Sequence, residues 1–393
     1  MILSHKIKLE PTVEQLIGLH KAAGCARYAW NWALTEWQNH YRATGKSPNV
    51  FELKKRWNRE KPAWVLESPK DANQQVFTYL KAAYSRFFKK TAGHPKLKRK
   101  GKTRDSFYLS NDRVILTGNR VKIPRIGAVK LTESLRFTGR VLSATVSRTA
   151  DRWFINIRVD VAAKPTIAEP ALDTLGIDVG LKHFAVCSDG TVQDAPKPLK
   201  AGLKRLKRLS SRHSRCKPAS LNKVKLSKRL ARHHYRVACI RQDFLHKLST
   251  QLASKAKTLV IEDLNIKGMV QNRSLARSLQ DAGLAEFRRM LQYKCGKAGT
   301  ALIAADRWYP SSQLCSGCGA RQKLSLADRT YRCHCCGAVI DRDLNAAHNL
   351  STVGYTGIQA CGQEGSGWRH TLLTKPSWMK QELNLATSTS CHK

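Results

Sequence analysis

The chain has 393 residues and a formal net charge of +42, because 70 Lys and Arg residues stand against 28 Asp and Glu residues. Its length exceeds one average domain, and so large a charge favours a polyanionic partner, usually nucleic acid, over a ribosomal-type or merely solubilising role. The twelve cysteines do not form the pattern of a disulfide scaffold, no signal-peptide pattern is evident, and no apolar run reaches the roughly 20 residues of a membrane helix. These features predict a protein of the reducing cytoplasm that does not bind membranes.

The N-terminal region is predicted to be one strand followed by helices. Residues 3–9 alternate in polarity like a short strand, and Thr12 and Gln15 then form the pattern of a capping box. Apolar residues at helical spacing follow over residues 16–37 and predict a long amphipathic helix. A second helix is expected near residues 49–59.

A third helix is predicted to start at Ser68-Pro69 and to bury an apolar face. Its flank carries amide and phenol groups that can read adenine edges in a major groove, although a solvated polar face explains them at least as well. The candidate nucleic-acid contacts on this flank are Gln74, Gln75 and Tyr79.

A basic linker at residues 94–102 is followed by an apolar pattern of period two, with turn signals at 118–119 and 150–151. Short strands at this spacing predict a small antiparallel barrel. The strand at residues 3–9 could pair into this barrel, which would make the helices an insertion. The other strands predicted for the barrel are 114–116, 121–123, 129–131, 142–146 and 153–159.

Beyond a linker at residues 162–171, the pattern is that of an α/β region. The buried strand at 175–180 carries Asp178, and the buried strand at 258–263 carries Glu262 near its end. A buried acid among leucine, isoleucine and valine costs free energy unless it has a partner or a metal ion. Each acid is therefore a candidate functional residue.

The segment from Lys200 to Lys247 holds sixteen Lys and Arg residues and a single acid. Apolar residues at helical spacing within it predict one long basic helix. We expect its charged surface to bind a nucleic-acid backbone through shape and charge, and a solvated helix face is the alternative interpretation. The residues that represent this surface are Lys204, Arg205, Lys207 and Arg208.

Two Cys-x-x-Cys pairs, each followed by glycine, lie fifteen residues apart within the later part of the α/β region. Four thiolates at this spacing are typical of a zinc ribbon, in which a structural zinc ion is held tetrahedrally. Cys335 is an alternative fourth ligand, but the glycine after Cys336 matches the glycine after Cys318. The predicted zinc ligands are Cys315, Cys318, Cys333 and Cys336.

A third acid, Asp343, stands at the start of a predicted helix, seven residues after the last of these cysteines. Hydrolysis of a phosphodiester requires an activated water and relief of charge on the attacking and leaving oxygens. Two divalent ions roughly 3.5–4 Å apart provide both, and carboxylates are their natural ligands. Asp178, Glu262 and Asp343 therefore predict a nuclease site that binds two Mg²⁺ ions.

At these motifs the chain resembles the TnpB proteins, which insertion sequences encode. The matching segments, in chain order, are Gly176–Gly190, Ile261–Asn265, the two Cys-x-x-Cys-Gly pairs and Asp341–Asn349. The resemblance continues from the first strand through residues 310–315 to 380–384, and so covers nearly the whole chain. It implies an RNA-guided DNA endonuclease with a RuvC-like RNase H fold, related to type V CRISPR effectors.

The resemblance also implies roles for individual residues. The three RuvC acids would be Asp178, Glu262 and Asp343. Asp341 is the rival for the third place, and Asp343 is preferred because the family's acid lies two residues before an asparagine, here Asn345. Asp263 is expected to have a structural role or to support the metal-binding acids without binding a metal itself.

The implied partners are a guide RNA from the transposon end and target double-stranded DNA beside a short target-adjacent motif. The implied location is the prokaryotic cytoplasm, in association with the nucleoid. Two other functions stay open, a nuclease-inactive RNA-guided repressor and a transposase. The intact acids argue against the repressor, and the resemblance argues against the transposase, since a separate tyrosine transposase moves such elements.

The expected architecture is a multidomain α+β protein. A helical recognition lobe is inserted in a small β-barrel, the wedge domain, and a RuvC-like α/β nuclease with an inserted zinc ribbon follows. The expected boundaries are 1–10 and 94–162 for the wedge, 11–93 for the recognition lobe, 172–311 and 340–352 for the nuclease, 312–339 for the zinc ribbon, and 353–393 for a partly disordered C-terminal tail.

Overall fold

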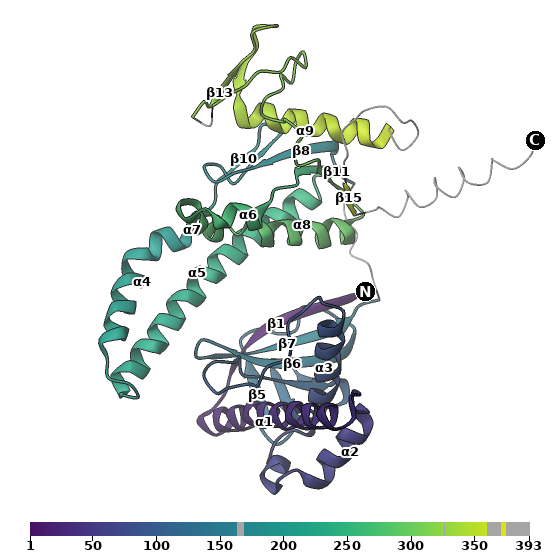
Figure 1. The fold of residues 1–393 in the computed structure, drawn as a ribbon, viewed down its shortest axis with the longest axis vertical. Coiled ribbons are helices and arrows are strands. Elements are labelled where there is room, and N and C mark those ends of the chain that lie inside the picture. Colours follow the sequence, from purple (N-terminus) through teal and green to yellow (C-terminus); the bar gives the residue numbers. More distant parts are fainter. Residues whose placement is uncertain (163–168, 326, 360–370, 375–393) are drawn as a thin grey trace, which may run out of the picture. The chain divides into compact units, whose positions relative to one another are not determined.

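The computed structural model divides the chain into two units, Met1–Pro165 and Thr166–Lys393 (Figure 1). The structure describes residues 1–162, 169–325, 327–359 and 371–374. Most of the predicted linker at 162–171 and most of the predicted tail at 353–393 lie outside these ranges. Across the described residues, no helix combines the length and the apolar character needed to cross a membrane.

The first unit is built on an antiparallel sheet. Its strands are β1 (Ile2–Glu10), β2 (Ser106–Ser110), β3 (Ile115–Thr117), β4 (Arg120–Ile123), β5 (Gly127–Leu131), β6 (Arg140–Thr149) and β7 (Arg152–Asp160). They follow the order β2-β6-β7-β1-β5-β4-β3. β1 lies in the middle, with Ile7 opposite Ile155 of β7 and Leu9 opposite Leu131 of β5. The prediction that the first strand pairs into the later ones is therefore confirmed.

The predicted closed barrel is not seen in this sheet. β2 and β3 are the two ends of the strand order, and no pairing joins them within residues 1–162. Closure requires a continuous hydrogen-bond ladder around the sheet, and β3, with three residues, offers only a short edge for one. β2 was not predicted, because its apolar residues, Phe107 and Leu109, are too few to establish a period next to the basic linker.

The three predicted helices of the first unit are confirmed. They are α1 (Val13–Thr44), α2 (Val50–Glu60) and α3 (Lys70–Phe88). The capping box forms as predicted, because the Thr12 hydroxyl accepts a hydrogen bond from the Gln15 N–H and the Gln15 side chain accepts one from the Thr12 N–H. One apolar core joins these helices to the sheet; it includes Ile7, Leu19, Trp57, Phe77 and Ile155.

The second unit contains a sheet of mixed strand direction. Its strands are β8 (Leu172–Val179), β9 (Ala185–Cys187), β10 (Val192–Gln193), β11 (Ala256–Glu262), β12 (Ala301–Ala305) and β15 (Thr371–Thr374). The order is β10-β9-β8-β11-β12-β15, in which β8, β11 and β12 are parallel and the other pairs are antiparallel. β15 belongs to the predicted tail, so this part of the tail is an edge strand of the sheet.

Helices cover both faces of this sheet: α5 (Leu221–Ala253) and α8 (Leu284–Ala298) lie on one face and α9 (Arg342–Gln359) on the other (Figure 1). The other helices of the unit are α4 (Pro198–Arg215), α6 (Ile266–Gln271) and α7 (Arg273–Ala282). Alternate residues of β11 face opposite layers: Leu259 and Ile261 share a core with α5 and α8, whereas Val260 packs with Leu350 of α9. The unit is therefore a three-layer α/β structure.

The prediction of one long basic helix between Lys200 and Lys247 is wrong, because the segment folds as a helical hairpin of α4 and α5 (Figure 1). Pro218 has no amide hydrogen to donate within a helix, and Ala219 has a left-handed φ of 62°. Ser220 then caps α5, since its side chain accepts a hydrogen bond from the Lys223 N–H. The proline and the capping serine were sequence signals for this turn.

Candidate active site and metal centre

Two of the three predicted acids lie on neighbouring strands at the same edge of the sheet. β8 and β11 are parallel, with Ile177 opposite Ile261, so the next residue along each strand is an acid. These residues are Asp178 and Glu262, and both side chains are partly buried. The carboxyl ends of parallel strands are the usual position of the functional site in open α/β sheets.

The third acid comes from α9. Gly176, two residues before Asp178, lies so close to α9 that a Cβ atom there would overlap the carbonyl oxygen of Ala347. Ala347 stands about one helical turn after Asp343, so this contact places the first turn of α9 beside the end of β8. The missing side chain of Gly176 is what allows the helix to come so near.

The other two acids act on the carboxyl group of Asp178. Burial is the largest cause of a raised pKa at Asp178, and the charges of Glu262 and Asp343 add to it, so that this pKa rises to about 8. Burial also raises the pKa of Glu262, against a hydrogen bond from Ser311 that acts to lower it. Such a cluster is stabilised by cations, and carboxylate oxygens are preferred ligands of Mg²⁺, so the donor chemistry fits a divalent ion.

Asp343 and Asp341 have different surroundings. Arg342 forms an ion pair with Asp343 at 3.0 Å, and Arg329 approaches the same carboxylate at 3.8 Å. The exposed Asp341 instead caps α9, because its carboxylate accepts hydrogen bonds from the N–H groups of Asp343 and Leu344 at 2.9 and 3.1 Å. This difference favours Asp343 over Asp341 as the third acid of the site.

Asp263, next to Glu262 in the chain, is paired with arginines. Its carboxylate contacts Arg288 and lies 3.2 Å from Arg307. Burial acts to raise the pKa of Asp263, but the two guanidinium groups outweigh that effect and the pKa is lowered. These contacts agree with the structural role predicted for this residue.

Sequence reasoning missed Ser311. Its side chain is 3% exposed, and its hydroxyl donates a hydrogen bond to Glu262 Oε1 at 2.5 Å. A serine has no pattern of its own in a sequence, and this one was used only as part of the family resemblance. Arg342 and Arg329 were missed because nothing distinguishes them from the many other cations of the chain.

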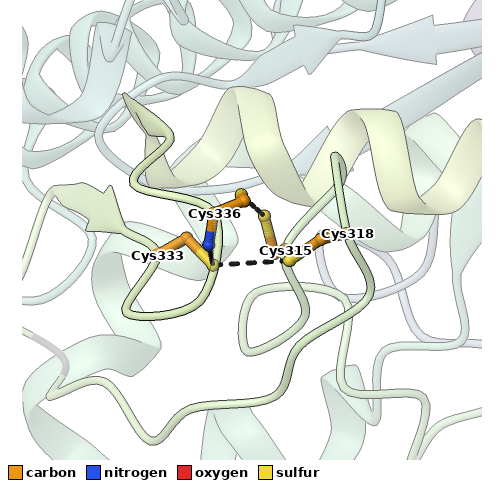
Figure 2. Close-up of side chains that lie close together, drawn as sticks. All are labelled: Cys315, Cys318, Cys333 and Cys336. Carbon is orange, nitrogen blue, oxygen red and sulfur yellow. Dashed lines mark hydrogen bonds between the residues drawn. The ribbon is translucent and has the colours of Figure 1, made fainter.

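The four predicted zinc ligands meet at one point (Figure 2). Their sulfur atoms all lie within 4.8 Å of one another, with 3.6 Å between Cys315 and Cys336 and 3.5 Å between Cys318 and Cys333. Four thiolates around a tetrahedral zinc, at Zn–S bonds of about 2.3 Å, lie about 3.8 Å apart. The set therefore fits zinc. Cys335 is exposed and does not belong to it.

Two matching turns hold these cysteines, one between the bridged residues Leu314 and Arg321 and one between the paired strands β13 (Thr330–Arg332) and β14 (Val339–Asp341). Gly319 and Gly337 have φ values of 75° and 72°, and each N–H donates to the carbonyl oxygen of the first cysteine of its pair, at 2.9 and 3.1 Å. The N–H groups of Cys336 and Cys335 also point at Cys333 Sγ and lower its pKa to about 6. That sulfur is therefore readily a thiolate, the form that binds zinc.

The residues predicted to contact nucleic acid differ in exposure. Tyr79 is 44% exposed and Gln75 is partly buried. Gln74 is buried, and its amide donates to Asn58 Oδ1 and Asn73 Oδ1 at 2.8 and 3.1 Å. The structure contradicts a nucleic-acid contact for Gln74, because it lies on the side of α3 that faces α2. The four basic residues of α4 that were predicted to contact nucleic acid are exposed; they are Lys204, Arg205, Lys207 and Arg208.

The chain has an α/β fold similar to that of Cas12f. The chain is similar to the protein in a cryo-EM structure of a Cas12f1-sgRNA-target DNA complex, with a TM-score of 0.53 and 17% identity over 86% of this chain and 83% of that chain. The family described as "Cas12f1-like, TNB domain" matches residues 285–350, which include all four cysteines. The families described as "Probable transposase" and "Helix-turn-helix domain" match residues 156–273 and 1–46.

Relatives in three organisms give the family. A protein of Streptomyces pristinaespiralis named "Putative RNA-guided DNA endonuclease" is 33% identical over 98% of this chain and 96% of that protein. The Escherichia coli K12 protein "Putative RNA-guided DNA endonuclease InsQ" is 30% identical over 91% and 93%. The "TnpB-like protein L79" of Acanthamoeba polyphaga mimivirus is 32% identical over 34% and 27%. The chain belongs to the TnpB family, as its motifs predicted.

Proposed function

We propose that this chain is an RNA-guided DNA endonuclease that cuts double-stranded DNA beside a short target-adjacent motif. The proposal is supported by the register that puts Asp178 and Glu262 at the ends of two adjacent parallel strands, and by the charges of Glu262 and Asp343, which act on Asp178. The names of the relatives and the net charge of +42 support nucleic acid as both guide and substrate.

Two kinds of metal site would serve this function. The three acids would hold two Mg²⁺ ions, and the four cysteines would hold one zinc ion. When bound, the Mg²⁺ ions supply positive charge at the attacking and leaving oxygens and lower the pKa of the attacking water. Four thiolates close the coordination shell of the zinc and leave no place for a water, so the zinc is structural.

The chain's own part in cleavage is to hold these carboxylates in place. The parallel pairing of β8 and β11 would hold Asp178 beside Glu262, and the close approach of α9 to Gly176 would bring Asp343 near them. Arg342 holds Asp343 through its ion pair. Sites on strands and helices keep such groups in a more precise arrangement than sites on loops.

The domains expected from the family can be assigned to the two units, with the wedge and recognition lobe in the first and the nuclease in the second. An antiparallel hairpin beside parallel strands in the second sheet supports a RuvC-like RNase H fold. The wedge (1–10 and 94–162) and the recognition lobe (11–93) would bind the guide RNA and read the target-adjacent motif, with Gln75 and Tyr79 as contacts. The basic residues of α4 would bind the backbone of the guide RNA or of the RNA–DNA hybrid. We place the protein in the prokaryotic cytoplasm, at the nucleoid.

The test is to sequence the RNA that copurifies with the expressed protein and its neighbouring transposon DNA, and then to offer the complex a plasmid library that matches the guide. Cutting of matched plasmids with Mg²⁺ supports the proposal. Binding without cutting would indicate a repressor, and strand-transfer products would indicate a transposase.

A further inference from the structure

One short segment, residues 311–316, reaches both candidate metal sites of the second unit. At its start, the Ser311 hydroxyl donates a hydrogen bond to Glu262 Oε1 at 2.5 Å. Near its end stands Cys315, the first of the four predicted zinc ligands. A displacement of this segment would therefore move groups at the acids and at the cysteines together.

Two asparagines of α9 hold this segment. Asn345 Nδ2 donates to the carbonyl oxygen of Leu314 at 2.6 Å, and Asn345 Oδ1 accepts from the Ser316 N–H at 2.9 Å. Asn349 Nδ2 donates to the carbonyl oxygens of Ser311 and Leu314 at 2.7 and 2.8 Å. The two asparagine side chains are 0% and 5% exposed, and hydrogen bonds in such dry surroundings are costly to leave unmade.

The same helix carries the third acid. Asp343 lies two residues before Asn345 and six before Asn349, all on α9. The asparagine contacts hold α9 against segment 311–316. They therefore also hold Asp343, which α9 carries, relative to Glu262, which Ser311 contacts. A glutamate side chain has several rotatable bonds, so its carboxylate needs such a partner to keep one orientation.

We propose that Ser311 is a positioning residue for Glu262, and that Asn345 and Asn349 position Ser311 from the helix that carries Asp343. This proposal rests on the proposed function, because the orientation of Glu262 matters only if Glu262 binds a catalytic metal ion. The Ser311 hydroxyl occupies one carboxylate oxygen of Glu262 and leaves the other for a cation. The segment thereby links the zinc ribbon to the acids.

The experiment compares Ser311→Ala with Ser312→Ala, a matched loss of one hydroxyl at the next, partly buried residue. Partners of metal-binding residues typically change metal affinity or activity by about 10- to 100-fold when removed. We expect Ser311→Ala to raise the Mg²⁺ concentration for half-maximal cleavage by about that factor. Mn²⁺ binding to the zinc-loaded full chain, followed by electron paramagnetic resonance, should weaken in parallel.

Two further variants test the route of the effect. Ser311→Thr keeps the hydroxyl and should restore metal affinity to within about threefold of wild type, since the hydrogen bond can still form. Asn349→Ala should weaken Mn²⁺ binding in the same direction as Ser311→Ala. Zinc content and RNA affinity should stay at wild-type values in the serine variants.

The outcomes separate the two proposals. Equal behaviour of Ser311→Ala and Ser312→Ala in Mn²⁺ binding would overturn the positioning role. Loss of zinc or of thermal stability in proportion to the loss of Mn²⁺ binding would also overturn it, because the hydroxyl would then serve only the fold. A wild-type complex that fails to cut matched DNA, with Mn²⁺ binding still sensitive to Ser311, would refute the proposed function alone.

Discussion

The two candidate metal sites of the second unit are built in opposite ways. The cysteine site consists of two short turns of the same design, each closed by a glycine of positive φ, and two of its four cysteines are exposed. The carboxylate site takes one acid from each of β8, β11 and α9, and the negative charges of Glu262 and Asp343 repel that of Asp178. A site made of local turns survives many changes elsewhere, whereas a site made of three distant elements depends on the whole sheet and on α9.

The largest expected effect comes from removing a single acid. Asp178→Ala, Glu262→Ala and Asp343→Ala should each lower cleavage by about 10³-fold or more, and double mutants should lose little further, since the acids act as one unit. Guide-RNA binding should be unchanged. The check is single-turnover cleavage of matched DNA, together with RNA affinity.

Asp341→Ala is the matched control for the acids. Its loss removes the cap of α9 and should cost about 1 kcal/mol of stability, with cleavage lowered less than about tenfold. If Asp341→Ala abolished cleavage while Asp343→Ala cut normally, the two residues would have to exchange roles.

The next largest effect concerns the cysteine site. Cys336→Ser should lose the zinc ion and lower the unfolding temperature, because binding of structural zinc contributes directly to folding. Cys335→Ser should retain one zinc per chain, since Cys335 lies outside the four-sulfur set. Metal analysis of the purified variants decides between them, and the reverse pattern would move the fourth ligand to Cys335.

A smaller effect is expected on the α4 surface, where no fixed geometry is needed and only charge matters. Changing Lys204, Arg205, Lys207 and Arg208 together to glutamine should weaken binding of every guide RNA alike. Each phosphate contact contributes about 0.7 to the slope of log affinity against log salt for single strands, so the slope should flatten by up to about three. An affinity series in salt measures this, and an unchanged slope would indicate a merely solvated helix.

The smallest expected effect is a pH dependence of stability that comes from the carboxylate site. The pKa of Asp178 is raised from about 3.8 to about 8, so the folded state keeps a proton that the unfolded state has lost between these values. The free energy of unfolding therefore falls as pH rises through this window. Without Mg²⁺, Asp178→Asn should unfold at a higher temperature than wild type at pH 8, and the gain should vanish near pH 4.

Thermal unfolding of zinc-loaded protein at both pH values measures the gain. Added Mg²⁺ should stabilise wild type more than Asp178→Asn at pH 8, because the ion offsets the repulsion that the variant lacks. Asp341→Asn should show no such gain. A stability difference independent of pH would mean that Asp178 is not crowded by the other acids.

The contrast between the sites explains what the sequence could predict. The zinc ligands follow from spacing alone, because a Cys-x-x-Cys-Gly turn is complete within a few residues. Each acid could be assigned to a strand or a helix, but the register that joins Asp178 to Glu262 and the approach of α9 to Gly176 depend on the folded sheet. The chemistry of phosphodiester hydrolysis and the family resemblance connected Asp343 to the other two in advance, but neither could supply the contact that brings α9 to the sheet.

The wrong or missing predictions also concern features that depend on how separate segments pack together. The turn between α4 and α5 was signalled by Pro218 and Ser220, but the run of basic residues continues through it and was assigned to one helix. Gln74 looked like a surface amide, yet its helix face packs against α2 and buries it. Ser311 could not be predicted at all, because its contact with Glu262 exists only after the chain segments have come together.

The measurement that tests the central claim most directly is an exchange of the guide. The purified protein is combined with an RNA whose guide segment has been replaced, and cleavage is mapped on DNA that carries both the old and the new target beside the same adjacent motif. The account predicts that cutting moves to the new target with Mg²⁺ and is absent with Asp178→Ala. Cutting that ignores the guide, or that persists without Asp178, would contradict it.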